Sequence, residues 1–134
     1  MHICSYIYIQ IRRWGVMVDL LFKALSEESR LRILAMLLER EMCVCEIEIC
    51  LNLTQSNASR HLTILKNSGI LDCYKQAQWA YYKISESFKL ENKELWNYLQ
   101  IQLKQLKTYQ QDFNECVKCK EKDICSNIHK SLKG

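Results

Sequence analysis

The sequence predicts a mainly α-helical fold with one small β-hairpin. Proline is absent from the 134 residues and glycine occurs only three times, so few residues interrupt helices. Apolar residues recur at helical spacing through most of the chain, and only one pair of neighbouring segments is β-prone. The length and the hydrophobic content of 49% suit one domain with a modest core.

Residues 1–16 form an N-terminal arm that differs from the segment after it. The arm alternates apolar and aromatic residues and ends in RRWGV before Met17. Arg-Arg-Trp can be encoded by AGG-AGG-TGG, which contains a purine-rich ribosome-binding sequence. One hypothesis is therefore that the native protein starts at Met17, and the alternative is a genuine arm. The mass of the natively expressed protein distinguishes the two.

The composition favours a cytoplasmic protein with reduced thiols and no membrane partner. The first residues place their basic side chains after the apolar run and lack the small-residue cleavage site of a secretory signal. No apolar run approaches the roughly 20 residues of a membrane-spanning helix. We therefore interpret the eight cysteines as thiols available for metal or redox chemistry, not as a disulfide framework.

Three helices are predicted in the first part of the domain. MVDLLFKAL, residues 17–25, reads as a short apolar helix, and Ser26 is the expected N-cap of the next helix. That helix, ESRLRILAMLLER, residues 28–40, is apolar almost all round and is expected at the centre of the core. A cysteine-containing helix follows at about residues 43–52.

The following segment completes a winged helix-turn-helix pattern. Thr54 is expected to cap a helix over QSNASRHLTILKNS, residues 55–68, which has an apolar inner stripe and a polar outer stripe. Gly69 stands where a helix C-terminus favours a left-handed residue. ILDCYK (70–75) and WAYYKI (79–84) then read as the two strands of a hairpin. Two short helices, a glycine and a hairpin make up this motif.

The second helix of such a unit enters the major groove of DNA. Four basic residues but one acid lie between residues 55 and 83, which concentrates positive charge where the DNA backbone would run. The alternative is a solvated helix face that lacks acids. His61 either touches phosphate or is a satisfied buried histidine, so it receives no base contact. The predicted contacts to double-stranded operator DNA are Gln55, Ser56, Asn57, Ser59, Arg60, Thr63, Lys66, Lys75 and Gln78.

Residues 86–115 are predicted to form one long helix. Its leucines and Phe113 recur at helical spacing and give more apolar face than a small domain can cover. We therefore expect a homodimer that forms through the terminal helices. The predicted division is an arm over 1–16, a winged helix-turn-helix DNA-binding and dimerisation domain over 17–115, and a cysteine-containing tail over 116–134.

Cys43 and Cys45 stand at the predicted N-terminus of the cysteine helix. Trivalent arsenic and antimony are soft and prefer three thiolates, and a helix N-terminus lowers the pKa of a thiol. Residues two apart on a regular helix point to nearly opposite sides, so one ion can bridge both only if the first turn unwinds. The alternative for Cys43 is a small buried apolar side chain. Cys50 and Cys73 are expected to serve packing.

LTQSNASRHLTILKNSGIL with the WAYYKI hairpin resembles the ArsR/SmtB family of metal-responsive bacterial repressors. The preceding EMCVCEI resembles the arsenic-sensing branch of that family. The resemblance covers about residues 18–110. It implies a winged-helix homodimer that represses its own operon and leaves DNA when arsenite or antimonite binds Cys43 and Cys45. The sequence departs from the pattern at Glu48, where that branch often has a third cysteine, and at Ala77, where the wing often has glycine.

The tail carries a second group of thiols, Cys116, Cys119 and Cys125, with the spacing C-x₂-C-x₅-C. They could form a second metalloid site, complete the first one, bind zinc with His129 as fourth ligand, or act as a redox pair. An inert tail is the remaining alternative. The predicted long helix contains no histidine, which counts against a zinc site between dimer helices.

The leading prediction is therefore a metalloid-responsive DNA-binding repressor that has no small-molecule substrate. A thiol redox or persulfide sensor on the same scaffold is the alternative. An enzyme is not expected, because the C-x₂-C pair follows a predicted helix and does not open one after a strand, as it does in thioredoxin-like proteins.

Overall fold

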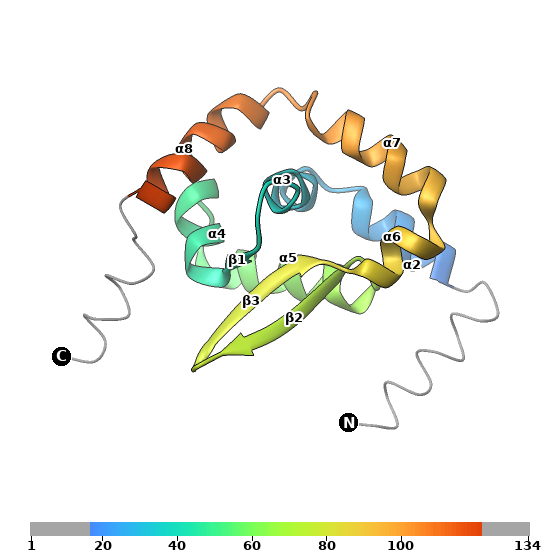
Figure 1. Ribbon diagram of the computed structural model, residues 1–134, viewed down its shortest axis with the longest axis horizontal. Coiled ribbons are helices and arrows are strands. Elements are labelled where there is room, and N and C mark those ends of the chain that lie inside the picture. The colour runs from blue at the N-terminus through green and yellow to red at the C-terminus, as the bar shows by residue number, and fades with distance from the viewer. Residues whose placement is uncertain (1–16, 122–134) are drawn as a thin grey trace.

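A computed structural model describes residues 17–121 of the chain and confirms a mainly helical fold with a small antiparallel sheet. The arm at 1–16 and the last part of the tail, with Cys125 and His129, lie outside the described residues. The elements, in chain order, are α2 (Met17–Leu25), α3 (Glu28–Leu37), β1 (Met42–Cys43), α4 (Val44–Leu51), α5 (Gln55–Asn67), β2 (Leu71–Gln76), β3 (Trp79–Ile84), α6 (Glu86–Glu91), α7 (Lys93–Leu103) and α8 (Tyr109–Glu121) (Figure 1).

Helix α3 lies at the centre of the molecule, as predicted. It packs against α5 and the sheet on one side and against α7 and α8 on the other (Figure 1). Its residues 33–37 are all buried and belong to one hydrophobic core with the inner faces of α4 and α5. No helix of residues 17–121 combines the length and the apolar character that a bilayer-spanning segment needs.

The N-cap of α3 is Glu27, so the prediction of Ser26 was wrong. Glu27 has extended backbone angles, and its carboxylate accepts a hydrogen bond from the Arg30 N–H at 3.1 Å. A carboxylate also suits the positive end of the helix dipole. The Ser26 hydroxyl instead donates to the Lys23 carbonyl at 2.8 Å, which satisfies a carbonyl at the end of α2.

The sheet has the strand order β1-β3-β2, and both pairs are antiparallel. The β2–β3 hairpin confirms the predicted wing, and Ala77 at its turn has a positive φ of 58°. Strand β1 was not predicted, and it pairs Cys43 with Tyr81 of β3. Cys43 was expected to begin a helix. It instead ends a strand and is the N-cap of α4, so it joins the wing to that helix.

Local signals position α5, the predicted recognition helix. Asn52 takes the left-handed conformation, with φ 53°, and ends α4. Two residues later, the Thr54 hydroxyl accepts a hydrogen bond from the Asn57 N–H at 3.2 Å, which confirms the predicted cap. Gly69 follows the helix with φ 86°, as predicted for a C-terminal left-handed residue. The helix is therefore fixed at both ends.

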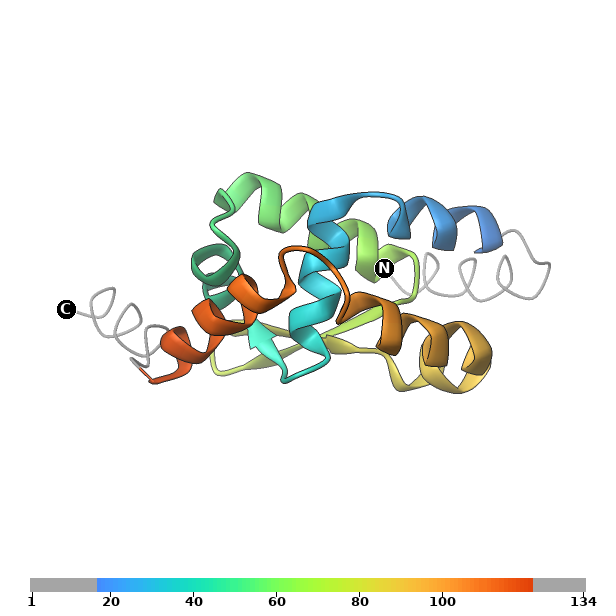
Figure 2. The same cartoon turned by 90° about the horizontal axis from the view of Figure 1, so that it is seen from above.

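The prediction of one long helix over 86–115 was wrong. The chain breaks at Asn92 and again between residues 104 and 108, where hydrogen bonds such as Tyr109 N–H to Leu106 carbonyl span three residues. After the second break, α8 folds back across α3 and α4 (Figure 2). This path buries Asp112, Cys116 and Cys119, which a straight helix would carry away from the core. Because α8 runs from residue 109 to 121, it also crosses the predicted start of the tail at residue 116.

Candidate nucleic-acid interface and thiol site

Helix α5 has one buried and one exposed face. Ala58, His61, Leu62 and Leu65 are buried against the core. The other face is a continuous polar surface that carries no acid. All seven predicted DNA contacts on this helix are exposed, namely Gln55, Ser56, Asn57, Ser59, Arg60, Thr63 and Lys66. Lys75 and Gln78 of the hairpin are exposed as well.

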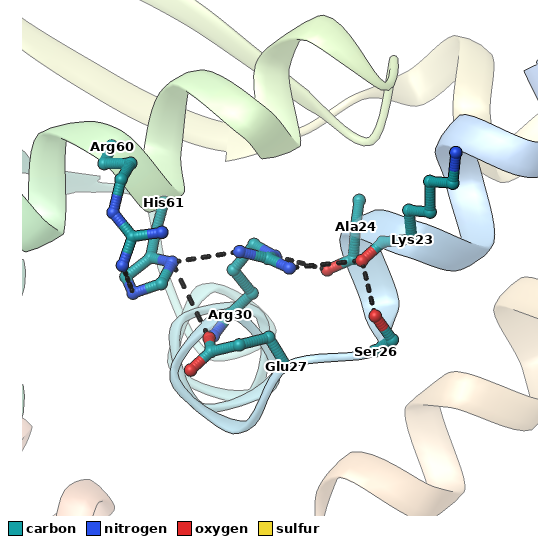
Figure 3. A network of polar contacts seen from close by, with 7 residues as sticks. All are labelled: Lys23, Ala24, Ser26, Glu27, Arg30, Arg60 and His61. Atoms are coloured by element: carbon teal, nitrogen blue, oxygen red, sulfur yellow. Dashed lines mark hydrogen bonds and ion pairs between the residues drawn. The ribbon is translucent and has the colours of Figure 1, made fainter.

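His61 belongs to a polar network under α5, shown in Figure 3. The side chain is 3% exposed, and its Nδ1 lies 3.2 Å from Arg30 Nη1 and 3.6 Å from the Glu27 carboxylate. Arg30 also donates from Nε to the Ala24 carbonyl at 2.7 Å and from Nη2 to the Lys23 carbonyl at 3.1 Å. The network therefore ties α2 and α3 to the recognition helix, and His61 is a satisfied buried histidine.

The protonation of His61 decides what Arg60 can do. Burial lowers the pKa of His61, the nearby Glu27 raises it, and the charges of Arg60 and Arg30 lower it further. A neutral imidazole accepts a hydrogen bond at only one nitrogen. Because Arg30 always donates and lies at 3.2 Å from Nδ1, we assign the proton to Nε2. The Nε2 proton then leaves Arg60, at 3.4 Å, without an acceptor there, so this guanidinium is available to a phosphate.

Cys43 and Cys45 occupy different surroundings at the start of α4. Cys43 is buried and its N–H donates to Glu46 Oε1 at 3.2 Å, which forms half of a capping box. Cys43 is also disulfide-bonded, so the expectation of reduced thiols does not hold at this residue. Because a disulfide sulfur is not a thiolate, Cys43 needs reduction before it can ligate an ion. Cys45, in contrast, is a free and partly exposed thiol in the first turn.

The expected activation of these thiols by the helix N-terminus is not met at Cys45. Partial burial raises the pKa of Cys45, and the charges of Glu48 and Glu46 raise it further. A hydrogen bond from the backbone lowers it, but less than burial and Glu48 raise it. Glu48 occupies the position where the arsenic branch often has a third cysteine, so the departure noted in the sequence has an electrostatic consequence. Cys45 therefore has to lose a proton when it binds an ion.

The packing of α4 against α8 brings a second group of thiols together, and the sequence did not predict this group. Cys50, which was expected to serve packing alone, contacts the thiols of both Cys116 and Cys119. Hydrogen bonding to Cys116 and burial raise the pKa of Cys50, whereas accepting that bond lowers the pKa of Cys116. Only the packing of α8 on α4 creates this contact, so no local sequence signal could have disclosed it.

Ion pairs hold α8 in this position. Both carboxylate oxygens of Asp112 accept hydrogen bonds from Arg32 of α3, at 2.8 and 2.9 Å. The same guanidinium donates to the Leu51 carbonyl at the end of α4, at 3.1 Å. Arg40 pairs with Glu46 of α4 and reaches the Cys116 carbonyl at 3.4 Å. Three helices are thus joined around the cysteines.

Neither group of thiols is a preformed metal site in the described part of the chain. No set of three histidine, cysteine or acidic side chains within residues 17–121 is arranged to hold an ion. Cys125 and His129, predicted as further ligands at the tail, lie outside this range. The expectation that Cys43 and Cys45 can share an ion only if a helix turn unwinds stays a prediction, and its premise changes, because Cys43 lies at the N-cap and not inside α4.

Comparison with known proteins identifies the family of this chain. Residues 27–72 match the family described as "Bacterial regulatory protein, arsR family". The structure resembles that of HlyU from Vibrio cholerae with a TM-score of 0.53 and 36% identity, over 63% of this chain and 92% of that one. The chain belongs to the ArsR family. It shares the winged helix-turn-helix fold with its structural neighbours, as predicted.

The curated relatives of this ArsR-family chain differ in the resistance that their names state. The arsenical resistance operon repressor of Escherichia coli is 44% identical over 66 residues, which are 48% of this chain and 56% of that protein. A cadmium resistance regulator homologue of Staphylococcus aureus is 39% identical over 66 residues, which are 48% of this chain and 54% of that protein. The chain thus spans about half the length of these relatives.

Structural neighbours of the ArsR-family chain include a dimer. The homodimeric winged helix-turn-helix DNA-binding domain Mb0332 of Mycobacterium bovis has a TM-score of 0.57 and 25% identity, over 66% of this chain and 82% of that one. The family description and the names of these relatives are those of regulators, in line with the predicted regulatory role.

Proposed function

We propose that this ArsR-family chain is a homodimeric, cytoplasmic repressor that trivalent arsenic or antimony releases from operator DNA by binding cysteine thiolates. The observation that carries the proposal is the position of Cys43 and Cys45. They lie where the wing and α4 meet, and α4 packs against the recognition helix. A change at these thiols therefore reaches both parts of the DNA-binding surface.

DNA binding rests on the outer face of α5. Its amide, hydroxyl and guanidinium groups are the side chains that contact bases and phosphates, and all nine predicted contacts are exposed. The hairpin adds the exposed Lys75, which lies on β2, a strand that packs against this helix, and can bind a further phosphate. Figure 1 shows α5 and the β2–β3 hairpin on the same side of the molecule, opposite α7 and α8. One face of a DNA duplex can therefore contact both α5 and the hairpin.

Release follows from the local geometry of the thiols. We expect that bringing the sulfurs of Cys43 and Cys45 onto one ion unwinds the first turn of α4, because Cys43 is buried at the N-cap and Cys45 is on the first turn. Unwinding breaks the hydrogen bond from Cys43 N–H to Glu46 and pulls on the pairing of Cys43 with Tyr81. The bound ion would thus favour a state in which wing and α5 no longer match DNA, which is allosteric coupling between two sites.

Dimerisation is supported by exposed apolar side chains on the terminal helices of the winged domain. Val18, Leu20 and Phe22 of α2 and Tyr98 and Ile101 of α7 are exposed. Figures 1 and 2 both place α2 and α7 at the same end of the molecule, away from α8. Contiguous exposed apolar surface marks interaction sites. We assign this surface to a second copy of the chain.

Arsenic is favoured over a hard cation by the chemistry of the donors. Thiolates select soft ions, and the two cysteines at the wing are the ligand types that arsenic and antimony prefer. The arsenical repressor of Escherichia coli supports this choice, while the cadmium regulator shows that soft divalent ions also occur as signals among relatives. A thiol redox sensor is the second candidate, because Cys43 is disulfide-bonded in the structure.

Fluorescence anisotropy on a promoter fragment from upstream of its own gene tests the proposal. The protein is first reduced with a phosphine, because a dithiol reductant would itself chelate arsenite. Near-stoichiometric arsenite should release the reduced dimer, and Cys45→Ser should need much more arsenite while binding DNA normally. Cys73→Ser, a free thiol in β2 remote from α4 in sequence, is the control and should respond like the wild type.

Three other outcomes decide against the arsenic assignment. Release by cadmium alone would replace the metalloid with a soft divalent ion. Release only on oxidation, by peroxide or a persulfide donor, would support the redox reading. Tight DNA binding that survives every treatment would show that α4 does not control the recognition helix.

A further inference from the structure

Three buried thiols from distant parts of the chain meet between α4 and α8. Cys50, Cys116 and Cys119 are 3%, 7% and 5% exposed, and Cys50 contacts both of the others. Cys116 and Cys119 are three residues apart on α8, so they share one face of that helix. We call these three residues the clasp cysteines. They are separate from the pair at the wing, because Cys50 lies near the C-terminal end of α4, about two turns from Cys43.

The surrounding contacts fix the clasp cysteines in place. The bidentate pair of Arg32 with Asp112 anchors α8 one turn before Cys116. The Arg32 bond to the Leu51 carbonyl anchors α4 at the residue next to Cys50. Both anchors use the guanidinium of Arg32, so one side chain holds α4 and α8 in position relative to each other. Their meeting is a property of the fold and does not depend on a mobile side chain at the surface.

Simple packing is the competing explanation for these thiols. Free cysteine often behaves as a small buried apolar residue. Packing does not, however, require that one thiol contacts two others, since alanine, valine or leucine fill such volumes without polar atoms. A cavity of about 210 Å³ also reaches Cys116 and is bordered by Arg40 and Lys120. The space is several times the roughly 30 Å³ of a water molecule, so a small neutral solute can reach the thiol.

We propose that Cys50, Cys116 and Cys119 bind one trivalent arsenic or antimony ion as a three-thiolate clasp between α4 and α8, in addition to the site at the wing. The proposal rests on the proposed function, since it assumes that the chain meets such ions. Arsenous acid reacts with three thiols to give three As–S bonds and three waters. Three As–O and three S–H bonds break, three O–H bonds form, and arsenic keeps its oxidation state.

The clasp closes by side-chain rotation and not by unwinding of a helix. The three sulfurs are not a preformed site in the described residues, but Cys50 already contacts both partners. Cysteine has one side-chain torsion with three staggered positions, so changes of rotamer, without any change in the helices, are the movement that would gather the sulfurs. Cys125 is not required. The bound ion then crosslinks α8 to the domain, which should raise thermal stability while the wing pair still controls DNA release.

The test counts arsenic on the full chain after reduction with a phosphine. Arsenic retained per protomer after gel filtration is measured by mass spectrometry, together with the near-ultraviolet absorbance of As–S bonds. We expect two ions in the wild type and one in Cys43→Ser/Cys45→Ser. Adding Cys50→Ala to that double variant should remove the last ion, whereas adding Cys125→Ser or Cys73→Ser should leave it. Melting with and without arsenite should show a rise in Tm in the double variant, lost with Cys50→Ala.

The outcomes separate this inference from the proposed function. If the double variant binds no arsenic while the wild type binds one ion and leaves DNA, the clasp is refuted and the repressor proposal stands. If the wild type binds none, both fail. If the last ion disappears with Cys125→Ser and survives Cys50→Ala, the site belongs to the tail and excludes α4. Circular dichroism without arsenite shows whether the Cys50→Ala variant is folded, and Cys119→Ser provides a second way to remove one ligand.

Discussion

Replacing Asp112 with alanine should detach α8 and destabilise the domain by about 2–3 kcal/mol. The carboxylate is 5% exposed and receives two hydrogen bonds from Arg32, whose side chain is 21% exposed. Removing one partner of a fully buried ion pair costs roughly 3–5 kcal/mol, because the other charge is left unpaired. Arg32 keeps some solvent and its bond to the Leu51 carbonyl, so we place the loss below that range.

Urea unfolding monitored by circular dichroism measures this loss, and Tm should fall by roughly 10 °C for a domain of this size. Lys118→Ala is the matched control on the same helix, because its pair with Glu115 is exposed and should contribute under about 0.5 kcal/mol. Replacing both partners with apolar residues, Arg32→Met with Asp112→Leu, should recover part of the loss, since no buried charge remains. If the unfolding free energy of Asp112→Ala lies within about 0.5 kcal/mol of the wild-type value, the ion pair does not anchor α8.

Four further predictions concern stability, pH, DNA and assembly. Ala77→Gly should raise the free energy of unfolding by about 0.5–1 kcal/mol in thermal melts, because Ala77 has a positive φ, which glycine adopts at less cost. A lower free energy of unfolding in the variant would contradict this prediction. The pKa of His61 is lowered in the folded state, so the stability that the neutral imidazole contributes is present above about pH 6.5 and is lost as the pH falls through the folded pKa. His61→Gln should therefore remove this pH dependence from the urea midpoint of unfolding. Arg60→Gln should weaken operator binding and lower the salt slope by about one, unlike Lys104→Gln, which changes a lysine that is also exposed but lies on no DNA-facing element. Ile101→Glu should give monomers in sedimentation, and an unchanged dimer would place the interface elsewhere.

Local signals made the recognition unit predictable. The apolar stripe of α5, the Thr54 cap and Gly69 all lie within one helix and its ends, so periodicity and capping chemistry disclosed them. The hairpin was equally local, since both strands and the turn are contiguous. The exposure of the seven predicted DNA contacts on α5 followed from the same periodicity. These elements need no distant partner to take their form.

Non-local packing explains what the sequence did not reveal. Strand β1 has only two residues and exists because β3 pairs with it, so no pattern within Met42–Cys43 could predict it. The break at 104–108 contains neither glycine nor proline, and helical propensity argued for continuity. Burial of Asp112 and the cysteines of α8 against α3 and α4 overrides that propensity. The meeting of Cys50 with Cys116 depends on the same break.

In the proposed mechanism, helix α4 is the element through which thiol chemistry influences DNA binding. Its first residue follows Cys43, which pairs with the wing, and its last residues lead through Asn52 to Thr54, the cap of α5. An ion at Cys43 and Cys45 acts on the end that joins the wing, whereas an ion at the clasp acts on the end that joins the recognition helix. With both ions bound, the clasp fixes the C-terminal end of α4, and distortion at the other end falls chiefly on the wing. The order of events can then be read from single variants, because loss of the clasp should change how much arsenite is needed for release without abolishing it.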